Sequence, residues 1–255
     1  MKKPKYLTMS FNFLLMLLIL ACKSDDATPT TTSTEVPDVY KKIYAASSIT
    51  SDGTYITIKT TGEPDHKSIY YPTTNSLYET FSGTTTYAGT AYVFKKNPNA
   101  IAAFNYTFKI PLNPKVATNH AATPLGAMGV SLNGVPFYNQ YAGPSQPLTG
   151  EFVSFDQFSG HPTGNNNYHY HVEPKHLTTV KATKSSLLGF LLDGFPVYGP
   201  EENGAAVTNT MLDAYHGHTH ATTDYPNGIY HYHITDADPF INGSGFYGTP
   251  GTVTQ

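Results

Sequence analysis

The stretch GVSLNGVPFY at residues 129–138 recurs, with an offset of 60 residues, as GFLLDGFPVY at residues 189–198. Each copy places Asn-Gly or Asp-Gly between two apolar runs. This pattern predicts a β-hairpin, because both central residues of a type I′ turn need a positive φ. A proline stands two residues after the glycine of each turn, which predicts that the returning strand lies at a sheet edge or leaves the ladder early.

The similarity continues downstream of both hairpins. An aspartate and then a Gly-His pair follow at the same internal spacing: Asp156, Gly160 and His161 in the first copy, Asp213, Gly217 and His218 in the second. Each copy then reaches Tyr-His-Tyr-His, at residues 168–171 and 230–233. We interpret residues of about 126–175 and 186–237 as a duplicated unit. Since one short hairpin cannot bury its apolar face alone, we predict a single domain with an internal pseudo-twofold duplication.

The rest of the composition favours strands punctuated by turns. The chain has 20 tyrosines, 14 phenylalanines, 21 glycines and 19 prolines, and these residue types suit strands and turns. Short β-branched and aromatic segments occur at residues 55–59, 91–94 and 104–110. The helix-like patches, around Leu187 and at residues 207–214, lack a convincing apolar stripe. The sequence therefore predicts an all-β or β-rich fold.

The N-terminus has the pattern of a secretory leader. Three lysines among the first five residues precede an apolar run from Phe11 to Leu20, which is too short to cross a bilayer of ~30 Å as a helix. Residues 19–22, Ile-Leu-Ala-Cys, resemble the lipobox at which lipoprotein leaders are cut and the cysteine is acylated. We predict a lipoprotein signal peptide at residues 1–21 and lipidation of Cys22, which would anchor the protein to a membrane. An ordinary or uncleaved leader is the alternative.

Residues 22–40 read as a flexible tether, because they are Thr, Ser, Pro and Asp with almost nothing apolar to bury. We place the folded domain at residues 41–255. Residues 23–26, Lys-Ser-Asp-Asp, resemble a signal that carries some lipoproteins to the outer face of the outer membrane, and an ordinary linker fits them equally well. The predicted location is therefore the outer membrane, lipid-anchored and facing the periplasm or the cell surface. Cys22 is the only cysteine, so the domain is expected to fold without disulfides.

The charge pattern argues against polyanionic partners. All 15 basic residues are lysine, against 18 acidic residues and a net charge of −3. Loss of the leader would take three lysines and no acids, giving (15 − 3) − 18 = −6. Without arginine the chain lacks the usual bidentate group for phosphate, and no glycine-rich phosphate loop follows a strand. We predict neither nucleic-acid nor nucleotide binding.

Histidines are concentrated in the repeat. Nine of the 11 histidines fall between residues 161 and 233. On a strand, His169 and His171 would face one way while Tyr168 and Tyr170 face the other. Imidazoles without thiolates suit zinc, copper, iron or nickel, and we predict a site for copper or zinc, between which the sequence does not choose. The predicted ligands are His161, His169, His171, His218, His231 and His233.

Several alternatives remain open around this ligand set. The six histidines would form either one shared site or two equivalent sites, and alternating Tyr and His also suits a half-buried strand with solvated histidines. Asp156 and Asp213 are candidates for orienting the imidazoles or for acid/base chemistry, or else turn aspartates that bond their own backbone. His216 and His220 have no counterpart in the first copy and are predicted to be solvated or auxiliary.

At these residues the chain resembles the YHYH-domain family, which is named for the tetrapeptide. The resemblance runs from about Tyr55 to Tyr247 and includes residues 62–66, Asn97-Pro98-Asn99, both hairpins, Tyr198-Gly199-Pro200 and both Gly-His to Tyr-His-Tyr-His segments. It implies an exported or surface-associated protein and assigns no activity. It also makes His66 a further candidate, outside the primary set because the repeat does not cover it.

Three functions follow as hypotheses. The first is a cell-envelope lipoprotein that binds a transition metal through its histidines. The second is a surface interaction module for glycans or another cell's envelope, with tyrosines as stacking platforms. The third is a metal-dependent extracytoplasmic enzyme, hydrolytic or oxidative, in which Asp156 or Asp213 would act as general base.

Overall fold

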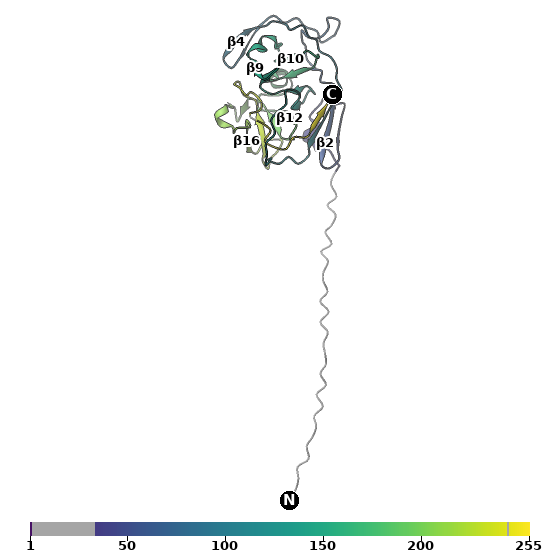
Figure 1. Ribbon diagram of the computed structural model, residues 1–255, viewed down its shortest axis with the longest axis vertical. Coiled ribbons are helices and arrows are strands. Elements are labelled where there is room, and N and C mark those ends of the chain that lie inside the picture. Colours follow the sequence, from purple (N-terminus) through teal and green to yellow (C-terminus); the bar gives the residue numbers. More distant parts are fainter. Residues whose placement is uncertain (2–33, 244) are drawn as a thin grey trace. The chain divides into compact units, whose positions relative to one another are not determined.

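The computed structural model describes residues 1, 34–243 and 245–255. The described residues from 34 onward lie in one compact unit (Figure 1), and the predicted β-rich fold is confirmed. The predicted signal peptide, the lipidation site at Cys22 and the first part of the tether lie outside the described residues. Within the part that the structure describes, no helix has the length and hydrophobicity that a membrane span requires.

The largest element is an eight-stranded sheet with the order β10-β11-β7-β6-β12-β13-β17-β16. Its strands are β6 (Gly129–Ser131), β7 (Pro136–Phe137), β10 (Gly160–Pro162), β11 (Tyr168–Tyr170), β12 (Leu187–Leu191), β13 (Pro196–Tyr198), β16 (Gly217–His220) and β17 (Ile229–His233). The two predicted hairpins, β6–β7 and β12–β13, form the centre and are joined through the antiparallel pair β6–β12. Figure 1 shows β10 and β16 on either side of β12.

The strand order is palindromic with respect to the two sequence copies. On one side β11 runs parallel to β7, with Tyr170 opposite Phe137. On the other side β17 runs parallel to β13, with Tyr232 opposite Val197. A duplicated unit would give this order, and the duplication itself stays a prediction.

The prolines predicted that the returning strands lie at a sheet edge or leave the ladder early. The edge alternative is wrong, whereas the strands do end after two and three residues. Strands β7 and β13 each lie between two neighbours in the sheet. Pro136 and Pro196 are the first residues of these strands, a position at which a missing N–H disturbs the ladder least. The strands are short, two and three residues long, so the sheet tolerates proline at their start.

A second sheet of four strands has the order β1-β2-β5-β18. Its members are β1 (Ser48–Ser51), β2 (Tyr55–Thr60), β5 (Tyr106–Pro111) and β18 (Thr252–Thr254). Strands β2 and β5 confirm two of the predicted strand segments, and their alternate residues Ile56, Ile58, Phe108 and Ile110 are fully buried. In contrast, every residue of the central strand β12 is buried, as expected for a strand covered on both faces.

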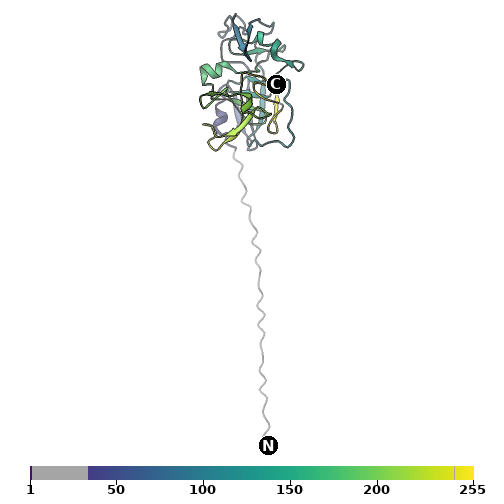
Figure 2. The same cartoon turned by 90° about the vertical axis from the view of Figure 1, so that its left-hand side faces the viewer.

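Three small hairpins complete the strands. They are β3 (Thr84–Tyr87) with β4 (Thr90–Val93), β8 (Tyr141–Ala142) with β9 (Gln146–Pro147), and β14 (Glu201–Glu202) with β15 (Ala205–Ala206). Hairpin β3–β4 confirms the strand predicted at 91–94. In both views it lies at the opposite end of the domain from β16–β17 (Figures 1 and 2).

In the residues that the structure describes, helical structure is limited to single turns. These are α1 (Asp38–Lys41), the 3-10 turns η1 (Leu148–Gly150), η2 (Phe152–Ser154) and η4 (Asn209–Met211), and the π-helical turn η3 (Leu177–Lys181). The patch at Leu187 is strand β12, and the patch at 207–214 contains only η4. Because Tyr40 of α1 is buried, the folded part begins before the predicted boundary at residue 41.

Candidate metal centres

The first tyrosine of each Tyr-His-Tyr-His motif is held by an aspartate. The Tyr168 hydroxyl donates to Asp156 Oδ2 at 2.8 Å, and the Tyr230 hydroxyl donates to Asp213 Oδ1 at 2.9 Å. Each carboxylate also accepts the N–H of its own Gly-His glycine, at 3.4 Å from Gly160 and 3.2 Å from Gly217. Of the two roles predicted for these aspartates, their hydrogen bonds match the turn role and not the orientation of imidazoles.

The glycine of each Gly-His pair is needed for this packing. A Cβ atom at Gly160 would lie 2.4 Å from the Tyr168 ring, and one at Gly217 would lie 2.4 Å from the Tyr230 ring. Real Cβ atoms do not approach so closely, so a larger residue would push the tyrosine away from its aspartate. The glycine therefore lets the tyrosine ring lie across the neighbouring strand.

The second tyrosine of each motif is held by the turn of the central hairpin. Asn133 Nδ2 donates to the Tyr170 hydroxyl at 3.1 Å, and the Tyr232 hydroxyl donates to Asp193 Oδ2 at 2.5 Å. The hairpin, the Asp-to-Gly-His segment and the tetrapeptide thus form one hydrogen-bonded unit. Since the tyrosines are fixed on one face of the strand, the histidines emerge together on the other.

The first cluster, here called the Glu151 centre, consists of Glu151, His161, His169 and His171. The Nε2 atom of His169 lies 3.1 Å from that of His161 and 2.9 Å from that of His171. Glu151 Oε2 lies 3.4 Å from His161 Nε2 and 3.6 Å from His171 Nε2. Nitrogen ligands ~2.1 Å from a tetrahedral ion are separated by about 3.4 Å, so the four donor atoms are spaced to share one ion.

Backbone carbonyls fix the tautomers of two of these histidines. The Nδ1–H of His169 donates to the carbonyl of Asn167 at 3.0 Å, and that of His171 donates to the carbonyl of Asn139. A carbonyl can only accept, so the proton of each neutral ring is on Nδ1 and the Nε2 lone pair is free. The two lone pairs face each other, which is unfavourable unless a cation lies between them.

The third histidine of this centre has the same orientation. His161 Nδ1 lies 2.7 Å from the hydroxyl oxygen of Ser154, and that hydroxyl donates to the carbonyl of Glu151 at 2.7 Å. Because the serine proton is used in this way, its oxygen accepts the Nδ1–H of His161. All three imidazoles therefore present Nε2 to the centre, as histidine ligands held by outer hydrogen bonds do.

Burial keeps the imidazoles of His169 and His171 neutral. It lowers the pKa of His171 to about 4, and burial followed by the neighbouring imidazoles lowers the pKa of His169 well below its usual value. Burial alone would raise the pKa of Glu151, but its contacts with His161 and His171 outweigh burial and lower that pKa. At neutral pH His169 and His171 are thus neutral nitrogen donors beside a carboxylate, the forms that bind metal.

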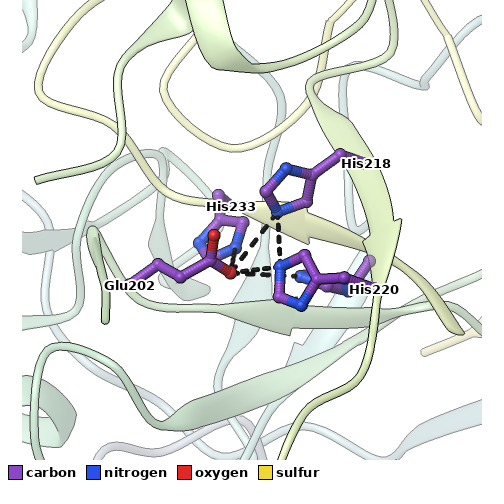
Figure 3. A group of neighbouring side chains, drawn as sticks. Glu202, His218, His220 and His233 are labelled. Carbon is purple, nitrogen blue, oxygen red and sulfur yellow. Dashed lines mark hydrogen bonds and ion pairs between the residues drawn. The ribbon is translucent and has the colours of Figure 1, made fainter. Parts of the chain in front are cut away.

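The second cluster, the Glu202 centre, contains Glu202, His218, His220, His231 and His233, with donor atoms all within 4.8 Å of one another. The Nε2 atoms of His218 and His220 are 3.0 Å apart. Glu202 Oε1 contacts His220 Nε2 and lies 3.5 Å from His233 Nε2. Figure 3 shows the carboxylate and the imidazoles of His218, His220 and His233 pointing toward one another.

Two nitrogens of the Glu202 centre are buried without a hydrogen-bond partner. They are Nε2 of His231 and Nε2 of His233. Their Nδ1–H groups donate to the carbonyls of Ile229 and Gly199, at 2.9 and 2.8 Å, and burial lowers the pKa of His231 to about 3. Buried polar atoms in native proteins nearly always have partners, and these two lone pairs are placed so that they could bind a cation.

The six predicted ligands are divided between the two centres, three in each. The alternative of one shared site does not fit, because β7, β6, β12 and β13 separate β11 from β17. Among the other histidines, His220 belongs to the Glu202 centre although it was predicted to be auxiliary. His216 is buried and not solvated, and its Nε2 bonds Asn209 at 3.1 Å. His66, also buried, bonds the Tyr170 hydroxyl and lies in neither centre.

Sequence reasoning missed both carboxylates. Glu151 follows η1, whereas Glu202 belongs to β14. The repeat pairs Asp156 with Asp213 and Tyr138 with Tyr198. With these offsets Glu151 corresponds to Thr208 and Glu202 to Ala142, so neither carboxylate is part of the repeat. The one sequence signal is that Glu202 closely follows the family motif Tyr198-Gly199-Pro200, which by itself does not identify a ligand.

Both centres open into clefts. The Glu151 centre lies in a cleft of about 590 Å³ and the Glu202 centre in one of about 1030 Å³. Volumes of this size are typical of small-molecule sites. A ligand from solution can therefore reach either centre.

The fold and these centres define a β-rich protein with two histidine and carboxylate clusters, each built on a Tyr-His-Tyr-His strand. Comparison with known families matches the YHYH protein family at residues 107–210 and 201–245, which together contain both centres and more than half of the chain. The chain belongs to the YHYH protein family. No curated protein and no solved structure matches it.

Proposed function

We propose that this protein is a lipid-anchored protein of the cell envelope that binds two transition-metal ions, copper or zinc, one in each centre. The observation that carries the proposal is the pair of facing lone pairs in the Glu151 centre. His169 Nε2 and His171 Nε2 are 2.9 Å apart while the Nδ1–H of each ring is committed to a backbone carbonyl. A shared cation is the arrangement that makes this geometry favourable.

The donor set supports a transition metal over calcium or magnesium. The centres offer three or four imidazole nitrogens and one carboxylate each, whereas calcium and magnesium prefer sites built from oxygen alone. Zinc and copper both accept imidazole and carboxylate ligands. We therefore keep both metals as candidates, and the titration below includes both.

The competing interaction-module hypothesis has less support. Most described tyrosines are buried or half-buried, and those that are exposed, Tyr44 and Tyr141, have 46% and 42% of their surface accessible. Stacking platforms for glycans need exposed rings. The tyrosines of the tetrapeptides instead hold the strands in place.

Metal stoichiometry of the purified full-length protein tests the proposal. After removal of metal with a chelator, we expect two zinc or copper ions to bind per chain in calorimetry. The variant His169→Ala/His171→Ala should bind one ion, His231→Ala/His233→Ala should bind one, and the quadruple variant none. His120→Gln, outside both centres, is the control and should bind two. A wild-type protein that ignores both metals would refute the proposal.

The location requires a separate experiment. The lipobox-like residues 19–22 and the absence of any other cysteine motivate it. We expect membrane fractionation to place the wild-type protein with the membranes and Cys22→Ser in the soluble extracytoplasmic fraction. Equal partitioning of the two proteins would refute lipidation at Cys22.

A further inference from the structure

The two centres differ at one equivalent position. His220 lies two residues after His218, and Thr163 lies two residues after the equivalent His161. The hydroxyl of Thr163 accepts the backbone N–H groups of Asn165 and Asn167, at 3.2 and 3.3 Å, and so caps the turn between β10 and β11. The Glu151 centre consequently has four donor residues where the Glu202 centre has five.

The cleft at the Glu151 centre has more lysines than carboxylates in its lining. Its lining includes Lys95 and Lys96, and Glu151 is the only acidic residue in it. Within the described part of the chain, neither lysine has a carboxylate at ion-pair distance, and Lys96 instead lies over the Tyr70 ring at 5.7 Å. A divalent ion at the centre would add to these unpaired charges.

The cleft at the Glu202 centre differs in this respect. Its lining lysines Lys42 and Lys181 pair with Asp224 and Asp65, and its lining contains further carboxylates, those of Glu201 and Glu202. The lysine charges there are already neutralised. An anion would thus be attracted to the first cleft more strongly than to the second.

We propose that the Glu151 centre keeps an exchangeable coordination position that binds a small anion, of the carboxylate or phosphate class, whereas the Glu202 centre is coordinatively filled. This inference rests on the proposed metal binding. Four protein donors would hold the ion of the Glu151 centre, and the anion would be its fifth ligand, the coordination number to which zinc sites can expand. The anionic oxygen occupies that position, and Lys95 and Lys96 attract the anion into the cleft.

The volume of the cleft limits the anion to a small molecule. At about 590 Å³, the cleft has the size of a site for a small organic acid or a phosphate ester. Tyr138 forms one wall, with its ring stacked on His169 at a centroid distance of 4.0 Å. A phenol ring at this place gives the organic part of the anion an apolar surface to contact.

Azide and inorganic phosphate binding to the cobalt-substituted full-length protein tests the inference, because the visible spectrum of Co²⁺ changes with its coordination. We expect two cobalt ions and one spectroscopically detected azide per chain, with phosphate displacing the azide. His220→Thr gives the Glu202 centre the residue that the Glu151 centre has at this position, Thr163. This variant should bind a second azide, because the Glu202 centre then also has four donor residues. Thr163→His should abolish the first, provided that metal analysis still gives two cobalt ions.

The lysines are tested by charge removal. Lys95→Ala/Lys96→Ala should weaken azide binding about fourfold at low salt, because it removes two positive charges on the order of 10 Å from the bound azide. The effect should be smaller at high salt, which screens this attraction. The control Lys59→Ala/Lys115→Ala removes the same charge from exposed positions outside both clefts and should leave azide binding unchanged.

The outcomes separate this inference from the proposed function. Two bound cobalt ions with either no azide or two azides in the wild type would overturn the inference and leave metal binding intact. An unchanged azide number in His220→Thr would also overturn it. Failure to bind two metal ions would instead refute the proposed function.

Discussion

Acidification of the metal-free protein is expected to destabilise it well above the pH at which most carboxylates titrate. Burial lowers the pKa of His171 from 6.5 to about 4. Between these values the unfolded chain binds a proton at this position and the folded protein does not. Stability is therefore present above pH 6.5 and is lost as the pH falls toward 4.

The size of the effect follows from the same two values. At pH 5, protonation of His171 in the unfolded chain alone lowers the free energy of unfolding by about 2 kcal/mol. In a domain of this size, 1 kcal/mol corresponds to about 2–4 °C in Tm, so His171 accounts for about 4–8 °C between pH 7 and pH 5. His231, with a pKa lowered to about 3, adds a loss of the same sign from the other centre.

Thermal unfolding of the chelator-treated protein at pH 7 and pH 5 measures this loss. In His171→Gln the difference in unfolding free energy between the two pH values should be smaller than in the wild type by about 2 kcal/mol. His120→Gln, outside both centres, should keep the wild-type difference. A wild-type Tm that does not change between pH 7 and pH 5, or a His171→Gln variant that retains the full loss, would refute the reasoning.

Three further outcomes are expected. Ser154→Ala removes the acceptor for the His161 Nδ1–H and should weaken metal binding at the Glu151 centre by about 10–100-fold in calorimetry, with the other centre unaffected. Glu202→Gln should weaken binding at the Glu202 centre only, and an equal loss at both centres would contradict their independence. Asn133→Asp places a carboxylate where an amide donates to Asp65 at 3.2 Å, so denaturant unfolding should show a loss of about 2–4 kcal/mol, whereas an unchanged midpoint would contradict the burial of that contact.

The sequence alone was sufficient for the class of fold and for most of the histidines that the two clusters contain. The repeated Asn-Gly and Asp-Gly turns predicted both central hairpins, because turn residues act locally. The predicted type I′ geometry is wrong, since only the glycine of each turn, Gly134 or Gly194, has a positive φ. The alternation of Tyr and His predicted that His169 and His171 share a face, and their Nε2 atoms are indeed 2.9 Å apart. These predictions depend on backbone geometry over a few residues, which a sequence pattern specifies directly.

The sequence also placed Asp156 and Asp213 near the histidines without giving their role. Along the chain they precede the Gly-His pairs, as ligand-orienting groups could. In the structure the strand alternation sends the tyrosines, not the histidines, toward them. Which of two neighbouring side chains a carboxylate reaches depends on how adjacent strands pair, and that pairing is not local.

Only the tertiary structure decided the number of centres and their complete donor sets. The two tetrapeptide strands lie on opposite sides of four intervening strands, so the six histidines divide into two groups. Glu151 and Glu202 come from non-equivalent positions, a 3-10 region and a small hairpin, and no spacing in the sequence connects them to the histidines. Each cluster combines side chains from segments that are far apart in the sequence. Sheet order and loop packing bring these segments together, and short-range sequence patterns do not encode either of them.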